Sequence, residues 1–332
     1  MPSRHREDHW PKRWTRKNGA IYFVVPKEVR HLWEDRSWFR LGATEMEAWR
    51  EWFARTKPPE GVPRTISEAI LRYRGEILHT KGERTQKDYD RYLTMIDAGF
   101  GHMAPRELRP AQIYQAMDRM KPVAANRMRS TLSTLMSYCV RWGAIDRNPV
   151  REVHRNSEQP RDLYVEDEQL EAFLRHAGPL VRAWVPLKQA TGLRQGQMLA
   201  LDEDDWNDAT GELTARGVKK GFDVVYYGGQ LRAAVEGVFA LQRRPSRGEG
   251  PQPLFRARNG DRYTDDGFRS LWQYAMTKHV EGGGERFTEH DIRAKVASDS
   301  EDDLQAQARM GHRSLNTTRR VYRRKPQRVS AA

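Results

Sequence analysis

The sequence predicts a mainly helical α+β fold with two small sheets. Three observations carry this prediction. β-Forming residues surround an Asn-Gly pair near residue 18, apolar residues recur at helical spacing from about 65 to 142, and helical stretches flank short β-forming runs between 206 and 227. Breaks between these patterns divide the chain into residues 1–60, 61–160 and 161–332, which we predict to be three domains.

The composition is typical of a globular protein. Of the 332 residues, 38% are hydrophobic and 31% are charged, which is too apolar for a disordered chain. No apolar run approaches the roughly 18 residues of a membrane span, and the N-terminus has no signal-peptide core, so we expect a cytoplasmic protein without membrane contact. Cys139 is the single cysteine and is predicted to be buried, which leaves no disulfide within the chain and no zinc-finger spacing.

The net charge of +13 is unevenly distributed along the sequence. It is +4 for residues 1–60, +6 for 61–150, −5 for 151–308 and +8 for 309–332. The basic segments favour a polyanionic partner such as nucleic acid, bound with a salt-sensitive affinity. A solvated basic surface is the alternative that charge alone leaves open.

The first segment is predicted to be a small three-stranded sheet followed by a helix. Asn18-Gly19 indicates a hairpin because both residues tolerate the positive φ of a type I′ turn. Strands are expected at 20–25 and 38–42, and Thr44 can cap a helix over 45–56. The proline-rich stretch 57–63 is typical of a linker.

The second segment is predicted to be helical. Helices are expected near 65–78, 84–96, 110–118 and 123–142, followed by an extended connector over 151–162. In the last helix the apolar residues recur at spacings of three and four, which indicates a core-facing stripe made of Met128, Leu132, Leu135, Met136 and Cys139.

The third segment is predicted to combine helices with a short antiparallel sheet. Helices begin near 165 and 181, and strands are expected over 206–216 and 217–227. An Asp-Ala-Thr-Gly turn joins the strands, and Lys219, Lys220 and Gly221 form a second turn. The chain is then mainly helical to its end.

Two short motifs of this segment have the chemistry of anion sites. Arg194 follows a glycine turn at a predicted helix start, where backbone N–H groups and the helix N-terminus add to its guanidinium. His290 and Arg293 are three residues apart, so on a helix both face the same way. Considered singly, each arginine could instead form a structural salt bridge, and His290 could be a buried, hydrogen-bonded residue.

The basic stretch 309–325 contains His312 and Tyr322. Residues 309–332 hold eight Lys or Arg and no acidic residue. A phenol of ordinary pKa near ~10 becomes a useful nucleophile only where neighbouring cations stabilise the phenolate. Taken alone, the stretch favours a basic tail, because basic tails are far commoner than catalytic tyrosines.

The order of these motifs resembles that of the tyrosine recombinase family, of which phage integrases are a branch. A Thr-Gly-Leu-Arg box, a basic β-turn, His-x-x-Arg, Gly-His and a tyrosine ten residues after that histidine follow one another. The resemblance covers nearly the whole chain. Residues 1–60 look like the arm-type DNA-binding domain of lambda-type integrases, 61–160 like the helical core-binding domain that closes over DNA as a clamp, and 161–332 like the catalytic domain.

The resemblance implies six catalytic positions, namely Arg194, Lys219, His290, Arg293, His312 and the nucleophile Tyr322. Lys220 is the alternative to Lys219. The family usually has a glutamate where this chain has Gln197, and an amide keeps hydrogen bonds but supplies no charge, which puts its orienting role in doubt. Ala294-Lys295 likewise stands where His-Thr is commoner.

The reaction implied by the resemblance is attack of Tyr322 on a DNA phosphodiester to give a 3′-phosphotyrosyl bond, without ATP, metal or other cofactor. Arg194 and Arg293 would stabilise charge on the non-bridging oxygens, with a further donor from His312. Lys219 would protonate the leaving 5′-oxygen, and His290 would accept the tyrosine proton or bind phosphate.

The partners implied are double-stranded DNA, with core-type and arm-type attachment sites, and three further copies of the chain in a homotetramer. DNA-bending accessory proteins and an excisionase would be additional partners. Residues 323–332 are expected to contact DNA or a neighbouring subunit. The cations expected to face DNA from the clamp are Lys81, Arg84, Lys87, Arg91, Arg127 and Arg129, and a solvated helix face is the alternative for some of them.

Two other functions use the same residues. An architectural or regulatory DNA-binding protein could keep the fold without catalysis, but a decayed copy should have lost one of the six positions. A type IB topoisomerase shares the chemistry, but the arm-like first segment and the phage-like motifs argue against it.

Overall fold

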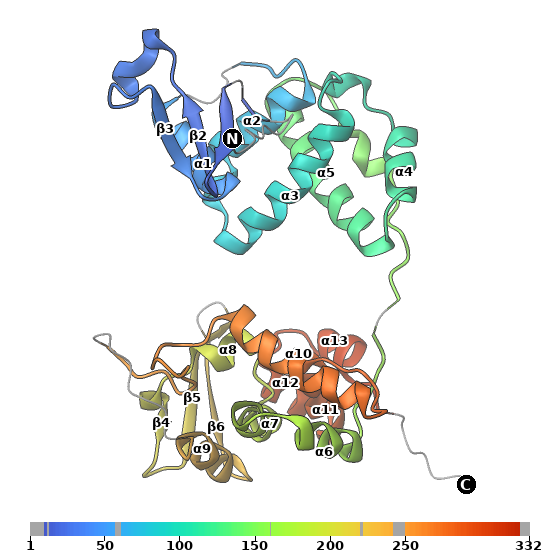
Figure 1. The fold of residues 1–332 in the computed structure, drawn as a ribbon. Coiled ribbons are helices and arrows are strands. Elements are labelled where there is room, and N and C mark those ends of the chain that lie inside the picture. The colour runs from blue at the N-terminus through green and yellow to red at the C-terminus, as the bar shows by residue number, and fades with distance from the viewer. Residues whose placement is uncertain are drawn as a thin grey trace. The chain divides into compact units, whose positions relative to one another are not determined.

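The chain forms two compact units, residues 1–159 and 160–332. The computed structural model, drawn in Figure 1, describes residues 10–11, 13–56, 61–159, 161–219, 222–241 and 250–325. The predicted boundary near residue 160 lies between the two units. The predicted division at residue 60 falls inside the first unit, where it stays a prediction.

The first unit begins with an antiparallel sheet of the predicted strands. Its order is β1 (Trp14–Lys17), β2 (Ala20–Val24) and β3 (Trp38–Gly42). Asn18 and Gly19 have φ values of 50° and 73°, as a type I′ hairpin turn requires. A 3₁₀ helix, η1 (Lys27–Leu32), lies between β2 and β3.

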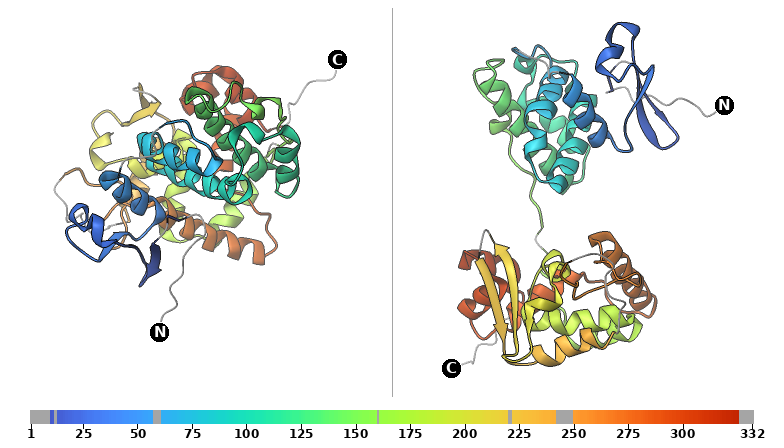
Figure 2. Two further views of the ribbon diagram at one scale, coloured as in Figure 1. Left: turned by 90° about the horizontal axis from the view of Figure 1, so that it is seen from above. Right: turned by 90° about the vertical axis from the view of Figure 1, so that its left-hand side faces the viewer.

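Helix α1 (Glu45–Arg55) packs on this sheet and on the helices that follow it (Figure 2). The Thr44 hydroxyl accepts a hydrogen bond of 3.2 Å from the backbone N–H of Glu47, which confirms the predicted cap. Between sheet and helix lies an aromatic core that includes Trp14, Phe23, Trp33 and Trp49. The sheet therefore gains its stability from aromatic burial, because three short strands alone are marginal.

The helical part of this unit agrees closely with the sequence. It consists of α2 (Ile66–Glu76), α3 (Glu83–Phe100), α4 (Pro110–Asp118) and α5 (Pro122–Arg141), with 3₁₀ turns η2 (Leu78–Thr80), η3 (Pro105–Glu107) and η4 (Pro149–Glu152). The stripe predicted on the last helix is buried in the bundle core. Cys139 is part of it, as predicted.

The connector after α5 is partly fixed to that helix. Arg129 donates from Nε to the Val153 carbonyl at 2.7 Å, and Asn126 donates from Nδ2 to the Asn156 carbonyl at 2.9 Å. Arg129 was expected to face DNA, and this expectation is wrong for its guanidinium, which instead satisfies backbone carbonyls of the connector.

The second unit begins with helices and a second antiparallel sheet. Its elements are α6 (Asp167–His176), α7 (Pro179–Thr191), α8 (Gln195–Ala200), η5 (Glu203–Asp205), β4 (Trp206–Asn207), β5 (Glu212–Lys219), β6 (Phe222–Tyr227) and α9 (Leu231–Phe239). The predicted strand boundary at 216/217 is wrong, because β5 continues through it. Gly217, at a φ of 59°, lies where the β5–β6 register shifts, so this residue marks a bulge within the strand.

The unit ends with α10 (Asp265–Glu281), α11 (Glu289–Asp299), α12 (Asp303–Met310), α13 (Leu315–Thr317) and a π-helical turn, η6 (Thr318–Tyr322). Helix α11 is enclosed by α7, α12 and η6. Nine of its eleven residues are buried, several of them charged. No helix in the described ranges is long and apolar enough to cross a membrane.

Candidate active site

Arg194 stands at the start of α8, where the sequence placed it. Gly192 turns the chain with a φ of 65°, and a side chain there would collide with Met310. The backbone N–H of Arg194 donates to Oε1 of Gln197 at 2.9 Å. Gln197 therefore keeps a hydrogen-bonding role at the start of this helix although it carries no charge.

Helix α11 presents His290 and Arg293 from its first turns. Asp291 accepts hydrogen bonds from the backbone N–H of Thr288 at 2.8 Å and from its hydroxyl at 2.7 Å, which fixes the helix start. Arg293 is fully buried, whereas His290 is enclosed on one side and keeps part of its surface exposed. The two residues thus lie on one helix, as predicted, but differ in how deeply they are buried.

The guanidinium of Arg293 joins three segments. It donates to the carbonyl of Gly192, to the carbonyl of Met310 at 2.6 Å, and lies 3.1 Å from Nε2 of His312. Gly192 is two residues from Arg194, and Met310 ends α12. Arg293 therefore holds the Arg194 turn against the segment that leads to Tyr322.

The contacts of His312 indicate its tautomer. A guanidinium is always a donor, so the Nε2 atom beside Arg293 must accept, and Nδ1 then carries the proton. Nδ1 lies 2.9 Å from the hydroxyl oxygen of Thr318, to which it donates.

Tyr322 lies on η6 and is only 6% exposed. Its ring centroid is 5.5 Å from that of His290 and 4.8 Å from that of His312, and the Arg293 guanidinium carbon lies 5.4 Å from it. The hydroxyl of Ser298 donates to the Tyr322 carbonyl at 3.0 Å. The structure thus gathers four of the six predicted positions and places Arg194 close to them through the Gly192 turn.

The predicted lysine position is only partly described. Lys219 ends β5, and its side chain lies outside the described part of the structure. Lys220 lies outside the described residues altogether.

The surrounding charges shift the protonation of the site. Enclosure of the imidazole lowers the pKa of His290, and the positive charge of Lys188 lowers it further. Burial lowers the pKa of Arg293, and the charge of Arg194 adds to this effect. A histidine of lowered pKa is neutral near pH 7 and can accept a proton.

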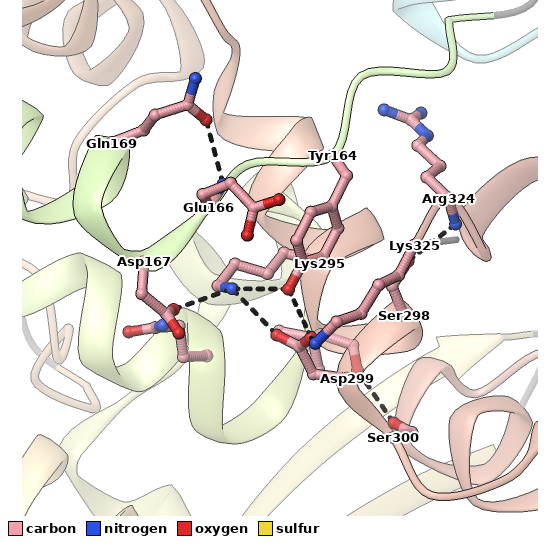
Figure 3. A network of polar contacts seen from close by, with 12 residues as sticks. Tyr164, Glu166, Asp167, Gln169, Lys295, Ser298, Asp299, Ser300, Arg324 and Lys325 are labelled. Atoms are coloured by element: carbon pink, nitrogen blue, oxygen red, sulfur yellow. Dashed lines mark hydrogen bonds and ion pairs between the residues drawn. The ribbon is translucent and has the colours of Figure 1, made fainter. Parts of the chain in front are cut away.

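Lys295 stands where the resemblance leads one to expect a threonine. In the structure its charge is neutralised by nearby carboxylates. Its buried ammonium contacts Asp167 at 2.8 Å, Asp299 at 3.0 Å and the Tyr164 hydroxyl at 3.0 Å (Figure 3). Lys325 reaches the same Asp299 at 3.2 Å. This network joins α11 to α6 and to the segment after Tyr322.

The segment after Tyr322 is bound within its own unit as far as it is described. Arg324 pairs with Asp291 at 2.7 Å, and Arg323 pairs with Asp303 at 3.0 Å. These cations were expected to contact DNA or a subunit, whereas here they neutralise nearby carboxylates. Sequence reasoning missed Asp291 as the partner of Arg324 because the pairing spans more than 30 residues.

Among the described residues, no group of three His, Cys, Asp or Glu side chains is placed to hold a metal ion. Neither a family model nor a curated protein sequence matches the chain.

The chain is similar to solved structures of two integrases. A lambda integrase dimer bound to a COC′ core site matches 99% of this chain and 100% of its own, with 19% identity and a TM-score of 0.68. A lambda integrase tetramer bound to a Holliday junction covers 99% of both chains, with 18% identity and a TM-score of 0.68. The Tn1549 transposon integrase with circular intermediate DNA matches 78% of this chain and 95% of its own, with 15% identity and a TM-score of 0.64.

Both integrases are tyrosine recombinases, the family whose motif order this sequence resembles. The likeness to the lambda integrase structure covers 99% of this chain and so includes both units. The chain therefore has the mainly helical fold of the tyrosine recombinases, as its sequence predicted.

Proposed function

We propose that the protein is a site-specific DNA recombinase, an integrase of the phage or mobile-element type that cuts and rejoins DNA through Tyr322. The observation that carries this proposal is the position of the Tyr322 ring among Arg293, His290 and His312. A guanidinium beside the phenol attracts a phosphodiester to the hydroxyl that would attack it.

In the proposed reaction the Tyr322 hydroxyl oxygen attacks phosphorus and the bond from phosphorus to the 5′-oxygen breaks. His290 takes the phenolic proton, and the turn lysine, Lys219 or Lys220, protonates the leaving 5′-oxygen. Arg194 and Arg293 stabilise the charge on the two non-bridging oxygens. The phosphotyrosyl bond conserves the phosphodiester energy, so attack by a new 5′-hydroxyl reverses the step.

The guanidinium of Arg293 is only partly engaged in this structure. Its terminal nitrogens contact two carbonyls and His312, whereas its buried Nε has no hydrogen-bond partner among the described residues. In the proposed reaction a phosphate oxygen would accept from that N–H or take the place of one of the present partners.

A groove in the helical bundle suits the clamp role proposed for residues 61–160. It has a volume of about 520 Å³ between α3 and α5, and Arg91 and Arg127 line it. Both arginines are exposed and could contact phosphates. We therefore propose double-stranded DNA, at core-type and arm-type sites, as a partner. The arginine-lined groove and the net charge of +13 support this proposal.

Assembly as a homotetramer on DNA, in the cytoplasm of a bacterial host, belongs to the same proposal. It is supported by the similarity to a lambda integrase tetramer bound to a Holliday junction. DNA-bending proteins and an excisionase remain proposed partners.

The decisive experiment is to trap the covalent intermediate. The full-length protein is incubated with a pool of nicked duplexes from the DNA around its gene, and the mixture is run on a denaturing gel. We expect a protein band with attached DNA that disappears with Tyr322→Phe. Tyr227→Phe is the matched control, because Tyr227 is 78% exposed and lies on β6, and its adduct should persist.

Three results separate the alternatives. A wild type that binds DNA without forming an adduct would indicate an architectural or regulatory protein. An adduct equally strong with Tyr322→Phe would exclude Tyr322 as nucleophile. Relaxation of any supercoiled plasmid, without paired sites, would indicate a type IB topoisomerase.

A further inference from the structure

Lys188 is a fully buried lysine near the end of α7. Its ammonium lies 2.5 Å from Oε1 of Glu289 and also donates to the carbonyl of Leu193. Leu193 immediately precedes Arg194, and Glu289 immediately precedes His290. One ammonium group therefore connects the residues adjacent to two of the proposed catalytic side chains.

The Glu289 carboxylate is held from a second direction. Its Oε1 accepts from Nε1 of Trp184 at 3.3 Å. Trp184 packs against Phe268 and Phe255, with ring centroids 3.9 and 4.8 Å away. The position of the pair is thus fixed by a rigid aromatic core and not by flexible surface groups.

Stability alone is a weak reason for such a pair. Removing two charges from water costs several kcal/mol per ion in general, and well-packed apolar residues often replace a buried pair without loss. What apolar residues would not reproduce is a directed bond to the Leu193 carbonyl together with one to the start of α11. Gln197 supplies only an amide oxygen to Arg194, so the charged contacts of this turn come from Lys188 at Leu193 and from Arg293 at Gly192.

We propose that Lys188 and Glu289 are positioning residues that hold the Arg194 turn and the His290 end of α11 in register for the reaction. This inference rests on the proposed function and adds to it two residues that the motif resemblance does not include. Neither residue touches the reacting atoms in this role. They act through the two segments to which they are bonded.

The same pair sets the electrostatic environment of His290. Two helices supply the charged groups that face this imidazole, which are Lys188 from α7 and Glu289, Asp291 and Arg293 from α11. The ring of Tyr322 faces it from η6. Enclosure and then Lys188 lower the pKa of His290, while Glu289 raises it. Removing the lysine should therefore raise the pKa of His290, and removing the glutamate charge should lower it.

The test measures cleavage of nicked DNA in single turnover against pH, with the full chain and its variants Lys188→Met and Glu289→Gln. With Lys188→Met we expect the rate at saturating DNA to fall about 100-fold through misplacement of the site, with little change in DNA affinity. The acid limb of the profile should move to higher pH. Glu289→Gln should move it to lower pH, and the double variant should lie between the two.

Lys295→Met is the matched control. It also removes a buried lysine that pairs with carboxylates near α11, but its partners are Asp167 and Asp299. It should lower thermal stability without moving the acid limb. A structural role for Lys188 alone would make the two methionine variants behave alike, and that result would overturn the proposal.

A second measurement needs no activity. The His290 ring is titrated by NMR in the DNA-free protein, with His290→Asn to assign its signal. Shifts of the His290 pKa in opposite directions in Lys188→Met and Glu289→Gln support the proposal, and equal or absent shifts refute it. If Lys188→Met does not fold, an unchanged His290 pKa in Glu289→Gln is enough to refute it. A wild type that titrates as expected but forms no adduct refutes the recombinase function instead.

Discussion

Helices α5 and α11 are held in their units by different kinds of interaction. Most of the buried residues of α5 lie in an apolar stripe that includes Leu132, Leu135 and Met136, and this stripe faces an apolar core. Helix α11 is buried on nearly all sides, and its buried residues include Glu289, Asp291, Arg293 and Lys295. Only α5 has the one-sided apolar pattern of an ordinary amphipathic helix.

The difference lies in what each kind of contact specifies. Apolar packing is non-directional, so many sets of similar side chains could hold α5 in place. Each buried charge of α11 has a particular partner, such as Arg324 for Asp291 and Asp299 for Lys295. These directed contacts fix α11 against the segments that carry the proposed catalytic residues, at the cost of burying charge.

The largest effect on stability is expected at Asp291. Asp291→Ala leaves the nearly buried Arg324 without its carboxylate and removes the cap on Thr288, so unfolding free energy should fall by about 3–5 kcal/mol. Urea unfolding of the full-length protein measures it. Asp208→Ala, which breaks the exposed pair with Arg232, is the control and should cost less than about 1 kcal/mol. Equal costs would mean that burial of the α11 charges has no energetic consequence.

The apolar counterpart is Leu135 on α5. Leu135→Ala should cost about 2–5 kcal/mol through lost burial and the cavity it leaves, whereas Leu135→Met should cost less than about 1.5 kcal/mol. The same unfolding assay applies. If the conservative Met replacement were as damaging as Ala, the core of α5 would be as specific as the surroundings of α11, and the contrast would fail.

A smaller, pH-dependent effect is expected at Asp299. Burial alone would raise the pKa of this carboxyl, but hydrogen bonds from Tyr164 and Lys295 outweigh burial and lower it. A lowered pKa stabilises the folded protein above the unfolded value of about 3.9, and this contribution is lost as the pH falls through the folded pKa. Unfolding measured from pH 6 down to pH 3 should therefore depend more steeply on pH in wild type than in Asp299→Asn. Parallel curves would contradict the network drawn in Figure 3.

The smallest effect concerns Cys139 on α5. Burial raises the pKa of its thiol to about 12, so almost no thiolate is present at pH 8. We expect no alkylation by iodoacetamide in the native protein and complete alkylation in urea, read by mass spectrometry. Rapid labelling of the native protein would show that the α5 core opens readily.

Local patterns predicted much of this fold because they depend on neighbouring residues. The Asn18-Gly19 hairpin, the Thr44 cap and the four helices from 66 to 141 follow from φ preference, capping and apolar spacing. The strand boundary at 216/217 failed because Gly217 can mark either a turn or a bulge, and only pairing with β6 distinguishes the two.

The order of the motifs, the residues of the candidate site and the amphipathic helices can all be predicted from the sequence alone. How the buried charges pair is known only from the three-dimensional structure. Lys188 meets Glu289, and Lys295 meets Asp167, across more than a hundred residues of sequence. No local pattern encodes such contacts, because a lysine's partner depends on which segments the whole fold brings together. The same holds for Tyr322, whose neighbours Arg293 and His312 are close in space only once α11, α12 and η6 have packed.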